Sequence, residues 1–471
     1  MPSPLATDLA RIVGPRWVRE RRAELATFSG DGLPTHASEP KLVVLPGCRE
    51  ELINVIRLLH RARLPFVARG AGTGLSGGAL ADGHAVLVTL TRLDRILQLD
   101  PVARRAVVEP GVVNARLSDA ARPFGLQYAP DPSSQTACTL GGNVAENAGG
   151  PHCLKYGVTT NHVMALEVIL PDGTLAQFGS VQGESWGPDL VGLFVGSEGM
   201  FGIASAVTLR LVPIPEAIHT LLADFGTVRA AGEAVSAIIA TGVIPAALEM
   251  MDQACVRAVE ASIYAAGYPT DAAAVLLVEL DGRPGSAAAE ATSVRETLIA
   301  HGARSVREAT DPAERARLWQ GRKKAFGAMG RIAPDLVVQD AVVPRSALPD
   351  ILDVIAEVGR RHGLAISNVF HAGDGNLHPN ISFDRSDAAL TERVHRASGE
   401  IVAACVAAGG SITGEHGVGI DKREYMPLLF SPGSLAAMCA VRRVFDPNDV
   451  ANPGKVVPIH ACREWRAGGV A

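Results

Sequence analysis

The amino-acid sequence predicts an α+β protein with two or three domains. Its 471 residues are 47% hydrophobic and 20% charged, a globular composition with enough chain for more than one core. Short helical patterns alternate with short strands and one hairpin in the first half, and longer alanine-rich helices alternate with strands in the second. Pro213 and Pro215 mark the change, so we expect a domain boundary near residue 215.

Composition and charge exclude several classes of partner. The formal net charge is -5 and no lysine or arginine run has aromatic interleaving, so we expect no nucleic acid partner. No apolar stretch approaches the roughly 18 residues of a membrane span, so we expect no direct membrane insertion. The 7 cysteines are scattered without a C-x-x-C pair, which favours reduced thiols in a cytoplasm and excludes a typical iron–sulfur cluster within this chain.

The first half contains a recognisable order of short elements. Periodicity predicts one or two short helices in 5–25, a helix over 49–64 and another from about 114 to 124. Short apolar runs predict strands, and the turn Pro171-Asp172-Gly173 predicts a hairpin over 163–179. The predicted strands before this hairpin lie at 65–69, 85–90, 96–100 and 105–111.

The stretch PFVARGAGTGLSGGAL (65–80) spells G-x-G-x-x-G with Gly72, Gly74 and Gly77. In a Rossmann fold this turn opens a long helix, but further glycines leave about six residues before the next strand. The stretch therefore predicts a backbone cradle for a phosphate without a Rossmann helix, with the side chains of Arg69, Thr73 and Ser76 close by. An ordinary glycine-rich turn is the alternative.

A second glycine-rich stretch, residues 130–157, has no helical or strand periodicity. It carries two glycine pairs and several serines and asparagines, so it offers polar donors without a hydrophobic face. A dinucleotide with a pyrophosphate would satisfy these donors; an ordered surface loop is the alternative.

The segment NVFHAGDGNLHPNIS (368–382) reads as a strand, a turn and a returning strand. His371 and His378 flank the turn, close enough to share one ion, and imidazoles suit zinc or a similar divalent metal. A purely structural histidine pair is the alternative, and Asp374 would then only cap the turn.

The segment GGSITGEHGVG (409–419) places Glu415 and His416 between glycines. Glu415 would complete a site of two histidines and one carboxylate, and His416 would remain as a base. A glycine-rich turn whose polar pair faces water is the alternative.

Together the motifs VARGAGTGLSGGAL, DPSSQTACTLGGNVAENAGG, VGSEGMFGI, HAGDGNLHPN, GEHGVG and NPGK resemble the FAD-linked oxidases of the vanillyl-alcohol oxidase superfamily. The likeness covers about residues 40–458 and is greatest to the branch of glycolate oxidase D subunits and D-lactate dehydrogenases.

This resemblance implies the domain organisation. A helical segment (1–36) would precede a PCMH-type FAD-binding domain of two α+β subdomains (37–215). An α/β substrate (cap) and metal domain (216–458) would follow, with its C-terminal segment returning to the flavin, and then a tail (459–471). FAD would be non-covalent, because the first loop lacks a tethering histidine. The resemblance places FAD against Arg69, Gly70, Gly72, Thr73, Gly74, Ser76, Asp131, Ser134, Gly141, Gly142, Asn147, Ile203 and Asn452.

The resemblance also implies a reaction, the oxidation of a 2-hydroxy acid to the 2-oxo acid by hydride transfer to flavin N5. His371, His378 and Glu415 would bind a divalent metal, which is zinc in this branch of the family. His416 would act as base, Asn380 would touch the substrate and Arg322 would clamp its carboxylate. Relatives that oxidise D-2-hydroxyglutarate carry a lysine where this chain has Val338 or Gln339, which favours glycolate or D-lactate. Lys323, Lys324 or Arg331 would have to substitute in a D-2-hydroxyglutarate enzyme.

Reduced FAD needs an electron acceptor, and the resemblance implies an iron–sulfur subunit, which would also be the route to the inner membrane. A homodimer is compatible with the family. Two other classes stay open at this point: a metal-dependent hydrolase, and a non-catalytic FAD-binding subunit.

Overall fold

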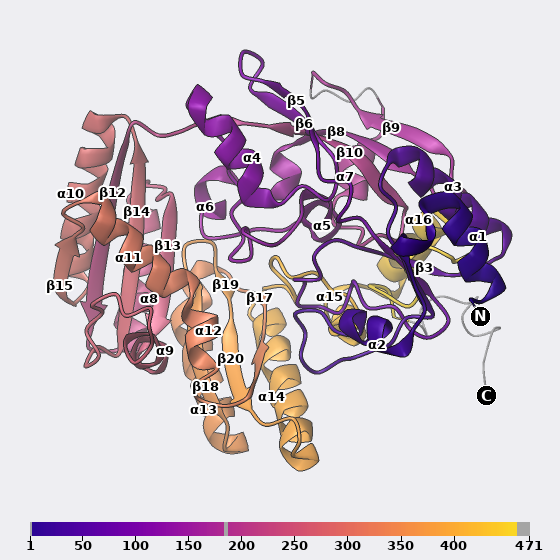
Figure 1. The fold of residues 1–471 in the computed structure, drawn as a ribbon. Coiled ribbons are helices and arrows are strands. Elements are labelled where there is room, and N and C mark those ends of the chain that lie inside the picture. The colour runs from indigo at the N-terminus through magenta and orange to yellow at the C-terminus, as the bar shows by residue number, and fades with distance from the viewer. Residues whose placement is uncertain (1, 183–186, 459–471) are drawn as a thin grey trace. The chain divides into compact units, whose positions relative to one another are not determined.

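The computed structural model describes residues 2–182 and 187–458, so the predicted tail 459–471 lies outside the described residues (Figure 1). It confirms the α+β class. The chain divides into two compact units, which are described separately. Unit 1 contains Met1–Gly149, Val158–Ile214 and Glu415–Ala471; unit 2 contains Gly150–Gly157 and Pro215–Gly414. The change in the sequence pattern near residue 215 therefore falls where the chain passes from unit 1 to unit 2, between Ile214 and Pro215.

Unit 1 contains a four-stranded sheet in the order β1-β2-β4-β3. The three strands β2, β4 and β3 are parallel, and the amphipathic helix α3 (Arg49–Arg61) connects β2 to β3. Leu52, Val55, Ile56 and Leu59 all lie on the buried face of α3, at the 3–4 residue spacing that the sequence showed. The other elements of this part are α1 (Pro4–Val13), β1 (Val18–Arg19), α2 (Arg22–Leu25), β2 (Leu42–Val44), β3 (Phe66–Arg69) and β4 (Val86–Thr89).

A second, antiparallel sheet of unit 1 has the order β5-β6-β10-β8-β9. The predicted hairpin over 163–179 is confirmed as β8 and β9, joined by a turn in which Gly173 has φ +83°. The hydrophobic core beside this five-stranded sheet contains the buried residues Leu166, Val168, Val207 and Leu209. The other elements of unit 1 include a separate two-stranded sheet of β7 and β11. Their bounds, with those of the five strands, are β5 (Ile96–Asp100), β6 (Arg105–Val108), α4 (Asn114–Ala121), β7 (Leu126–Gln127), β8 (Val163–Ile169), β9 (Leu175–Gly179), α7 (Leu190–Phe194), β10 (Ile203–Arg210), β11 (Val212–Pro213), α15 (Met426–Leu429) and α16 (Pro432–Phe445).

Unit 2 is built on one large antiparallel sheet, β15-β12-β14-β13-β18-β19-β17, with β20 paired to β18 and β16 paired to β20. The strands are β12 (Ala217–Phe225), β13 (Ala247–Asp252), β14 (Ala274–Gly282), β15 (Ala303–Glu308), β16 (Asp335–Val338), β17 (Ala341–Val342), β18 (Ala365–His371), β19 (Asn376–Leu377) and β20 (Pro379–Phe383).

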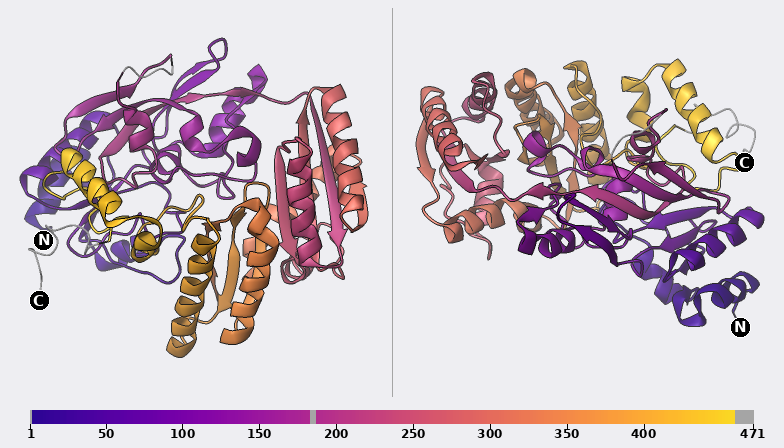
Figure 2. Two further views of the ribbon diagram at one scale, coloured as in Figure 1. Left: turned by 180° about the vertical axis from the view of Figure 1, so that it is seen from behind. Right: turned by 90° about the horizontal axis from the view of Figure 1, so that it is seen from above.

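Helices cover both faces of this sheet (Figure 2). One face packs against α8 (Val228–Ala240), α10 (Pro284–Ala300), α13 (Leu348–His362) and α14 (Ala388–Ala407). The other packs against α9 (Gln253–Glu260), α11 (Pro312–Lys323) and α12 (Ala325–Met329). Successive residues of β13 alternate between the two cores, so Leu248 and Met250 face the first, and Ala247 and Met251 face the second. Glu249 therefore points to the side of α9, α11 and α12.

Two expectations need correction. The stretch 130–157 is not irregular throughout, because residues 140–146 form the helix α5 (Leu140–Glu146) and residues 153–156 form α6 (Cys153–Tyr156). Thr139 caps α5 by accepting from the Gly142 amide, a local signal that the glycines obscured. Cys439 is disulfide-bonded, whereas Cys48, Cys138, Cys153, Cys255 and Cys405 are free thiols. The expectation of reduced thiols is wrong for Cys439, because sequence spacing does not show which sulfur atoms the fold brings together.

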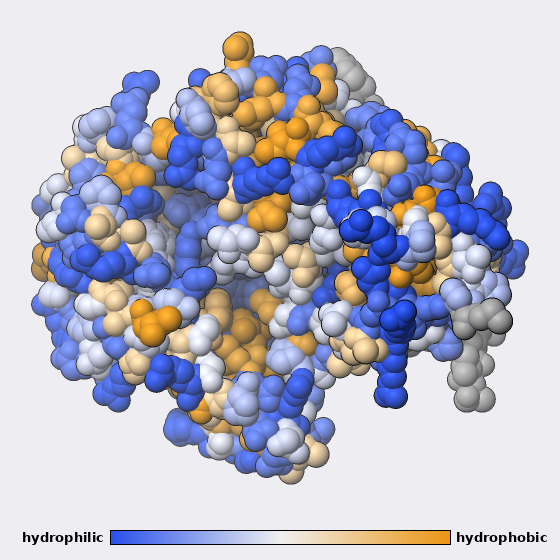
Figure 3. Space-filling view, viewed as in Figure 1, coloured by the Kyte–Doolittle hydropathy of each residue, from blue (hydrophilic) through white to orange (hydrophobic). Residues whose placement is uncertain are grey.

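The face seen in Figure 3 is largely hydrophilic, with hydrophobic residues gathered over the region of β5 in unit 1. Leu97, Val102 and Phe124 belong to the exposed hydrophobic side chains of that unit. None of the described helices has the length and apolar character that crossing a bilayer requires.

Candidate active site

The first glycine loop, between β3 and β4, contains no helix, as the sequence predicts. Gly72 and Gly77 have φ of +71° and +76°, a region that favours glycine. A Cβ on Gly70 would lie 2.2 Å from the Thr139 hydroxyl oxygen, so the loop packs directly against the start of α5. Arg69 donates from Nη2 to the Gly30 carbonyl at 2.7 Å, and it thereby fastens the segment before β2 to this loop.

Further segments of unit 1 converge on the same loop. A Cβ on Gly78 would lie 2.7 Å from Oε1 of Glu146 and 3.2 Å from Oε2 of Glu198. Asn452 donates to the Gly78 carbonyl at 3.0 Å, and Lys455 donates to the Leu80 carbonyl at 2.6 Å. The C-terminal segment thus returns to the first glycine loop within unit 1.

The motif around Glu198 joins two of these segments. Its carboxylate accepts from the Val418 amide at 2.6 Å and from the Gly419 amide at 2.8 Å. Gly419 has φ +52°, and a Cβ there would lie 2.0 Å from the Ser76 carbonyl oxygen. Glycine is therefore required where the chain after the GEHG motif meets the first loop.

Buried carboxyl groups dominate the electrostatics of this region. Burial, reinforced by the charge of Glu198, raises the pKa of Glu146 well above its usual range. Burial lowers the pKa of Lys455 to about 8, against the opposing effect of Glu198 and Asp31. Burial thus shifts both groups towards their uncharged forms.

The residues of this cradle fit FAD. The Ser76 and Ser197 hydroxyls and the Asn143 amide nitrogen are buried and have no hydrogen-bond partner within the described protein. Unsatisfied donors between closely packed glycines are what a large phosphate-bearing ligand would satisfy. Of the remaining predicted cofactor residues, Asp131 and Ile203 are buried, Ser134 is half-buried, and Asn147 has φ +53° and accepts from the Thr160 amide at 2.9 Å.

In unit 2, β18 and β20 place the two predicted histidines side by side. His371 ends β18, His378 directly precedes β20, and their ring centroids are 5.1 Å apart. Asp374 accepts from the Asn376 amide at 3.1 Å, so it caps the turn between them. The proximity that the sequence predicts for these histidines is confirmed.

Glu415 and His416 directly follow Gly414, which is the last residue of unit 2. The covalent chain therefore holds both side chains within two residues of Gly414. Single donor atoms of His371, His378 and Glu415 all lie within 4.8 Å of one another, and so do those of Asp340, His378 and His416. Two imidazoles and one carboxylate fit a zinc-like divalent ion with positions left for substrate.

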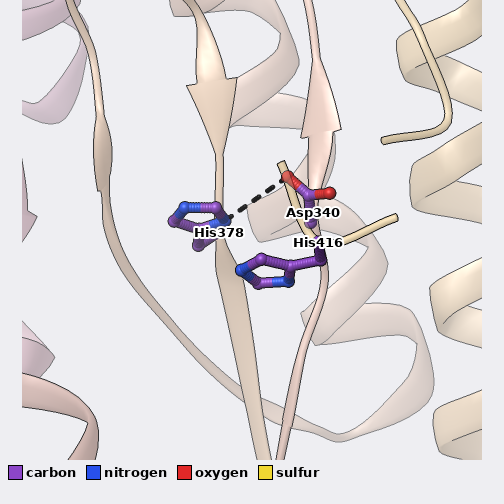
Figure 4. Close-up of side chains that lie close together, drawn as sticks. All are labelled: Asp340, His378 and His416. Atoms are coloured by element: carbon purple, nitrogen blue, oxygen red, sulfur yellow. Dashed lines mark ion pairs between the residues drawn. The ribbon is translucent and has the colours of Figure 1, made fainter. Parts of the chain in front are cut away.

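The sequence reading missed Asp340, which is fully buried. Its Oδ1 lies 3.8 Å from Nδ1 of His378, the ion pair that Figure 4 marks beside His416. Its Oδ2 accepts from the Thr413 hydroxyl at 2.5 Å and from the Gly414 amide at 2.9 Å. Asp340 thus lies beside one histidine and anchors the loop that leads into Glu415.

Glu249 was also missed. Nδ1 of His371 lies 2.8 Å from its Oε1, and Nη2 of Arg322 lies 2.5 Å from its Oε2. Burial would raise the pKa of Glu249, but the charges of Arg322 and His371 outweigh it and lower the pKa. The sequence signal for this residue is its place on β13: a carboxylate inside an apolar strand needs a partner.

The predicted substrate residues are enclosed. Arg322 on α11 is fully buried, and its Nε and Nη1 atoms have no hydrogen-bond partner within the described chain. Asn380 is fully buried and donates from Nδ2 to the His378 carbonyl at 2.6 Å. Gln339 donates to the Ser398 hydroxyl at 2.8 Å.

Fold and site together define an FAD-dependent oxidoreductase, and comparison with known proteins agrees. The description "FAD linked oxidases, C-terminal domain" matches residues 214–456, and "FAD binding domain" matches residues 40–179. The chain belongs to the FAD-linked oxidase family and is an enzyme of that family.

Among curated proteins, the chain is similar to glycolate oxidase subunits and to a D-lactate dehydrogenase. The chain is 48% identical to glycolate oxidase subunit GlcD of Escherichia coli strain K12, over 94% of this chain and 89% of that protein. It is 37% identical to the GlcD subunit of Bacillus subtilis, over 95% and 96% of the two chains. It is 32% identical to a D-lactate dehydrogenase of Anaerostipes hadrus, over 89% and 90%.

Solved structures share the fold at low sequence identity. A p-cresol methylhydroxylase with bound substrate matches with a TM-score of 0.82 and 16% identity, over 97% of both chains. A 4-ethylphenol oxidase of Gulosibacter chungangensis matches with a TM-score of 0.77 and 17% identity, over 96% of this chain and 97% of that one. These likenesses confirm the predicted PCMH-type fold class.

Proposed function

We propose that this protein is an FAD-dependent dehydrogenase of small 2-hydroxy acids, with glycolate or D-lactate as substrate. One observation carries the proposal: an FAD-linked oxidase, similar to proteins named glycolate oxidase subunit and D-lactate dehydrogenase, has His371, His378 and Glu415 with donor atoms within 4.8 Å of one another. A metal-dependent hydrolase would not require the FAD-binding domain that the chain contains.

When bound, FAD supplies a hydride acceptor and a divalent metal supplies a Lewis acid. The chain's own residues do the rest. His416, whose imidazole lies in one donor group with Asp340 and His378, takes the hydroxyl proton as general base. Arg322 holds the substrate carboxylate through the buried Nε and Nη1 atoms that lack protein partners. Asn380 contributes an enclosed amide beside His378.

The surroundings of Gln339 support a monocarboxylate. Its side-chain nitrogen is bound to Ser398 inside unit 2, and Val338 is apolar, so neither candidate for the place of the 2-hydroxyglutarate enzymes' lysine offers a cation. Lys323 lies over the Trp319 ring, 5.8 Å from its centroid, and Lys324 and Arg331 are exposed. A second substrate carboxylate would therefore lack a buried cation at this place.

We also propose that an iron–sulfur subunit accepts the electrons. The chain has no C-x-x-C pair that could hold a cluster, and the relatives with the highest identity reported above are named as subunits. The protein would then be cytoplasmic and reach the inner membrane only through that partner.

The test is anaerobic reduction of the purified FAD-loaded protein, followed by the loss of flavin absorbance. Glycolate, D-lactate, L-lactate and D-2-hydroxyglutarate are added separately. We expect rapid bleaching by glycolate or D-lactate and loss of bleaching after chelation of the metal. Bleaching by D-2-hydroxyglutarate alone would contradict the substrate assignment, and bleaching that survives complete metal removal would contradict the role of the metal.

A further inference from the structure

We propose that Glu249 is a positioning residue that links the metal site to the substrate-carboxylate site, so that the state of Arg322 changes the affinity of His371 for the metal. The inference rests on the proposed function for the metal. It concerns a residue that contacts neither substrate nor metal and acts through two residues that do.

The backbone fixes this arrangement. Glu249 on β13 is the direct cross-strand partner of His371 on β18 in the antiparallel ladder. Both side chains lie on the same face of the sheet, where cross-strand neighbours meet. Arg322 reaches the same carboxylate from α11, which packs on that face. A strand, its neighbour and a helix thus meet at one carboxylate.

Glu249 lies within hydrogen-bond distance of His371. Its two oxygens lie 2.8 and 3.0 Å from Nδ1, within hydrogen-bond range. Asp340, by contrast, lies 3.8 Å from Nδ1 of His378, too far for a direct hydrogen bond. An Nδ1 proton donated to Glu249 leaves Nε2 of His371 as the metal-binding nitrogen, and a carboxylate partner makes that nitrogen a stronger ligand.

Arg322 forms an ion pair with the same Glu249 carboxylate that holds His371. Arg322 is 0% and Glu249 1% exposed by side chain, so water screens their interaction little. While Arg322 is paired only with Glu249, it reduces the charge that the carboxylate offers to His371. A substrate carboxylate that binds Arg322 shares that cation and returns negative charge to the His371 side. Metal and substrate should therefore bind cooperatively, and the coupling is reciprocal.

The chain offers a matched control in unit 2. Glu279 is another buried carboxylate held by a histidine and an arginine, with His152 at 3.1 Å and Arg315 at 2.7 Å. Neither Glu279 nor its partners belong to the two groups of metal donors. Glu279→Gln removes the same kind of buried charge without touching the metal site.

The experiment measures zinc affinity of the FAD-loaded protein by competition with a chelator, without substrate, for wild type, Glu249→Gln, Arg322→Met and the double variant. We expect Glu249→Gln to weaken zinc binding roughly 10- to 100-fold. Arg322→Met should tighten it about threefold or more, because the undivided carboxylate charge then acts on His371. In the Glu249→Gln background, Arg322→Met should change zinc affinity less than about twofold.

Each outcome decides a different question. Wild-type protein that binds no divalent metal overturns the proposed function of the site. Wild type that binds zinc while Glu249→Gln binds it equally well overturns only the role of Glu249, as does an equal loss in Glu279→Gln. If FAD content and circular dichroism show that Glu249→Gln does not fold, Arg322→Met decides alone: unchanged or weaker zinc binding overturns the coupling.

Discussion

At the scale of single residues, the site depends on buried carboxylates behind the groups that do the chemistry. His371 is held by Glu249, and His378 faces Asp340, which also holds Thr413 and Gly414. His416 follows two residues after Gly414, so its position depends on that anchor. His416, which we propose as the base, would therefore need no backbone rearrangement before it accepts a proton.

Replacing His416 tests the catalytic base. We expect His416→Gln to slow anaerobic flavin reduction by about 10²- to 10⁴-fold, because the substituted side chain cannot accept the hydroxyl proton. FAD content should equal that of wild type. The control is His219→Gln, which changes a histidine of unit 2 paired with Glu308 and should leave the rate intact. A wild-type reduction rate in His416→Gln would remove His416 from the mechanism.

At the scale of elements, glycines allow four separate backbone segments to meet in the cradle. The first glycine loop approaches α5, the Glu198 loop and the segment after the GEHG motif at distances that leave no room for a Cβ. Buried donors such as the Ser76 hydroxyl have no hydrogen-bond partner within the described residues, so a ligand can satisfy them.

A single added methyl group tests this packing. In Gly419→Ala the new Cβ would meet the Ser76 carbonyl at 2.0 Å, and φ +52° is unfavourable for alanine. We expect FAD to bind this variant at least about tenfold more weakly than wild type, a loss of about 1.4 kcal/mol or more in binding. Gly433→Ala in α16, whose Cβ would have only the Ser431 hydroxyl at 3.7 Å, should bind FAD normally. Equal FAD content in both variants would contradict this role of Gly419.

Local patterns predicted much of this fold and site. The 3–4 residue spacing in α3, the hairpin of β8 and β9, and the turn between His371 and His378 are all short-range signals. Glu249 and Asp340 were not found, because their partners lie 122 and 38 residues away in sequence. Only the pairing of β13 with β18, and the loop before β17, bring those carboxylates to the histidines.

At the scale of the whole molecule, a buried ionic network attaches the detached segment Gly150–Gly157 to the rest of unit 2. Glu279 on β14 accepts from Arg315, His152 and the Thr220 hydroxyl. Lys155 also pairs with Asp281 on the same strand. Burial would raise the pKa of Glu279, but His152 and Arg315 outweigh it and lower the pKa to about 2. Unfolding therefore exchanges a strongly stabilised carboxylate for an ordinary one.

The sign of this effect gives a pH-dependent prediction. Because the folded-state pKa lies below the unfolded value, the stabilisation is complete above the unfolded pKa, near 4.5, and is lost as pH falls towards 2. We expect Glu279→Gln to lower the free energy of unfolding by about 3 kcal/mol at pH 7, and this gap to narrow by about 1 kcal/mol at pH 4. Urea unfolding of both proteins at the two pH values measures it. A gap that widens at pH 4 would show that another group dominates.

The return of the C-terminal segment bears on the order of synthesis and cofactor loading. Asn452 donates a hydrogen bond to the carbonyl of Gly78, which lies 374 residues earlier in the sequence. At translation rates of about 5 to 20 residues per second, roughly 20 to 75 seconds separate the appearance of these two residues on the ribosome. The glycine loop exists throughout that interval without the segment that completes it. Stable loading of the cofactor must therefore follow the synthesis of this segment, and any shorter ribosome-bound fragment would have to be kept soluble without it.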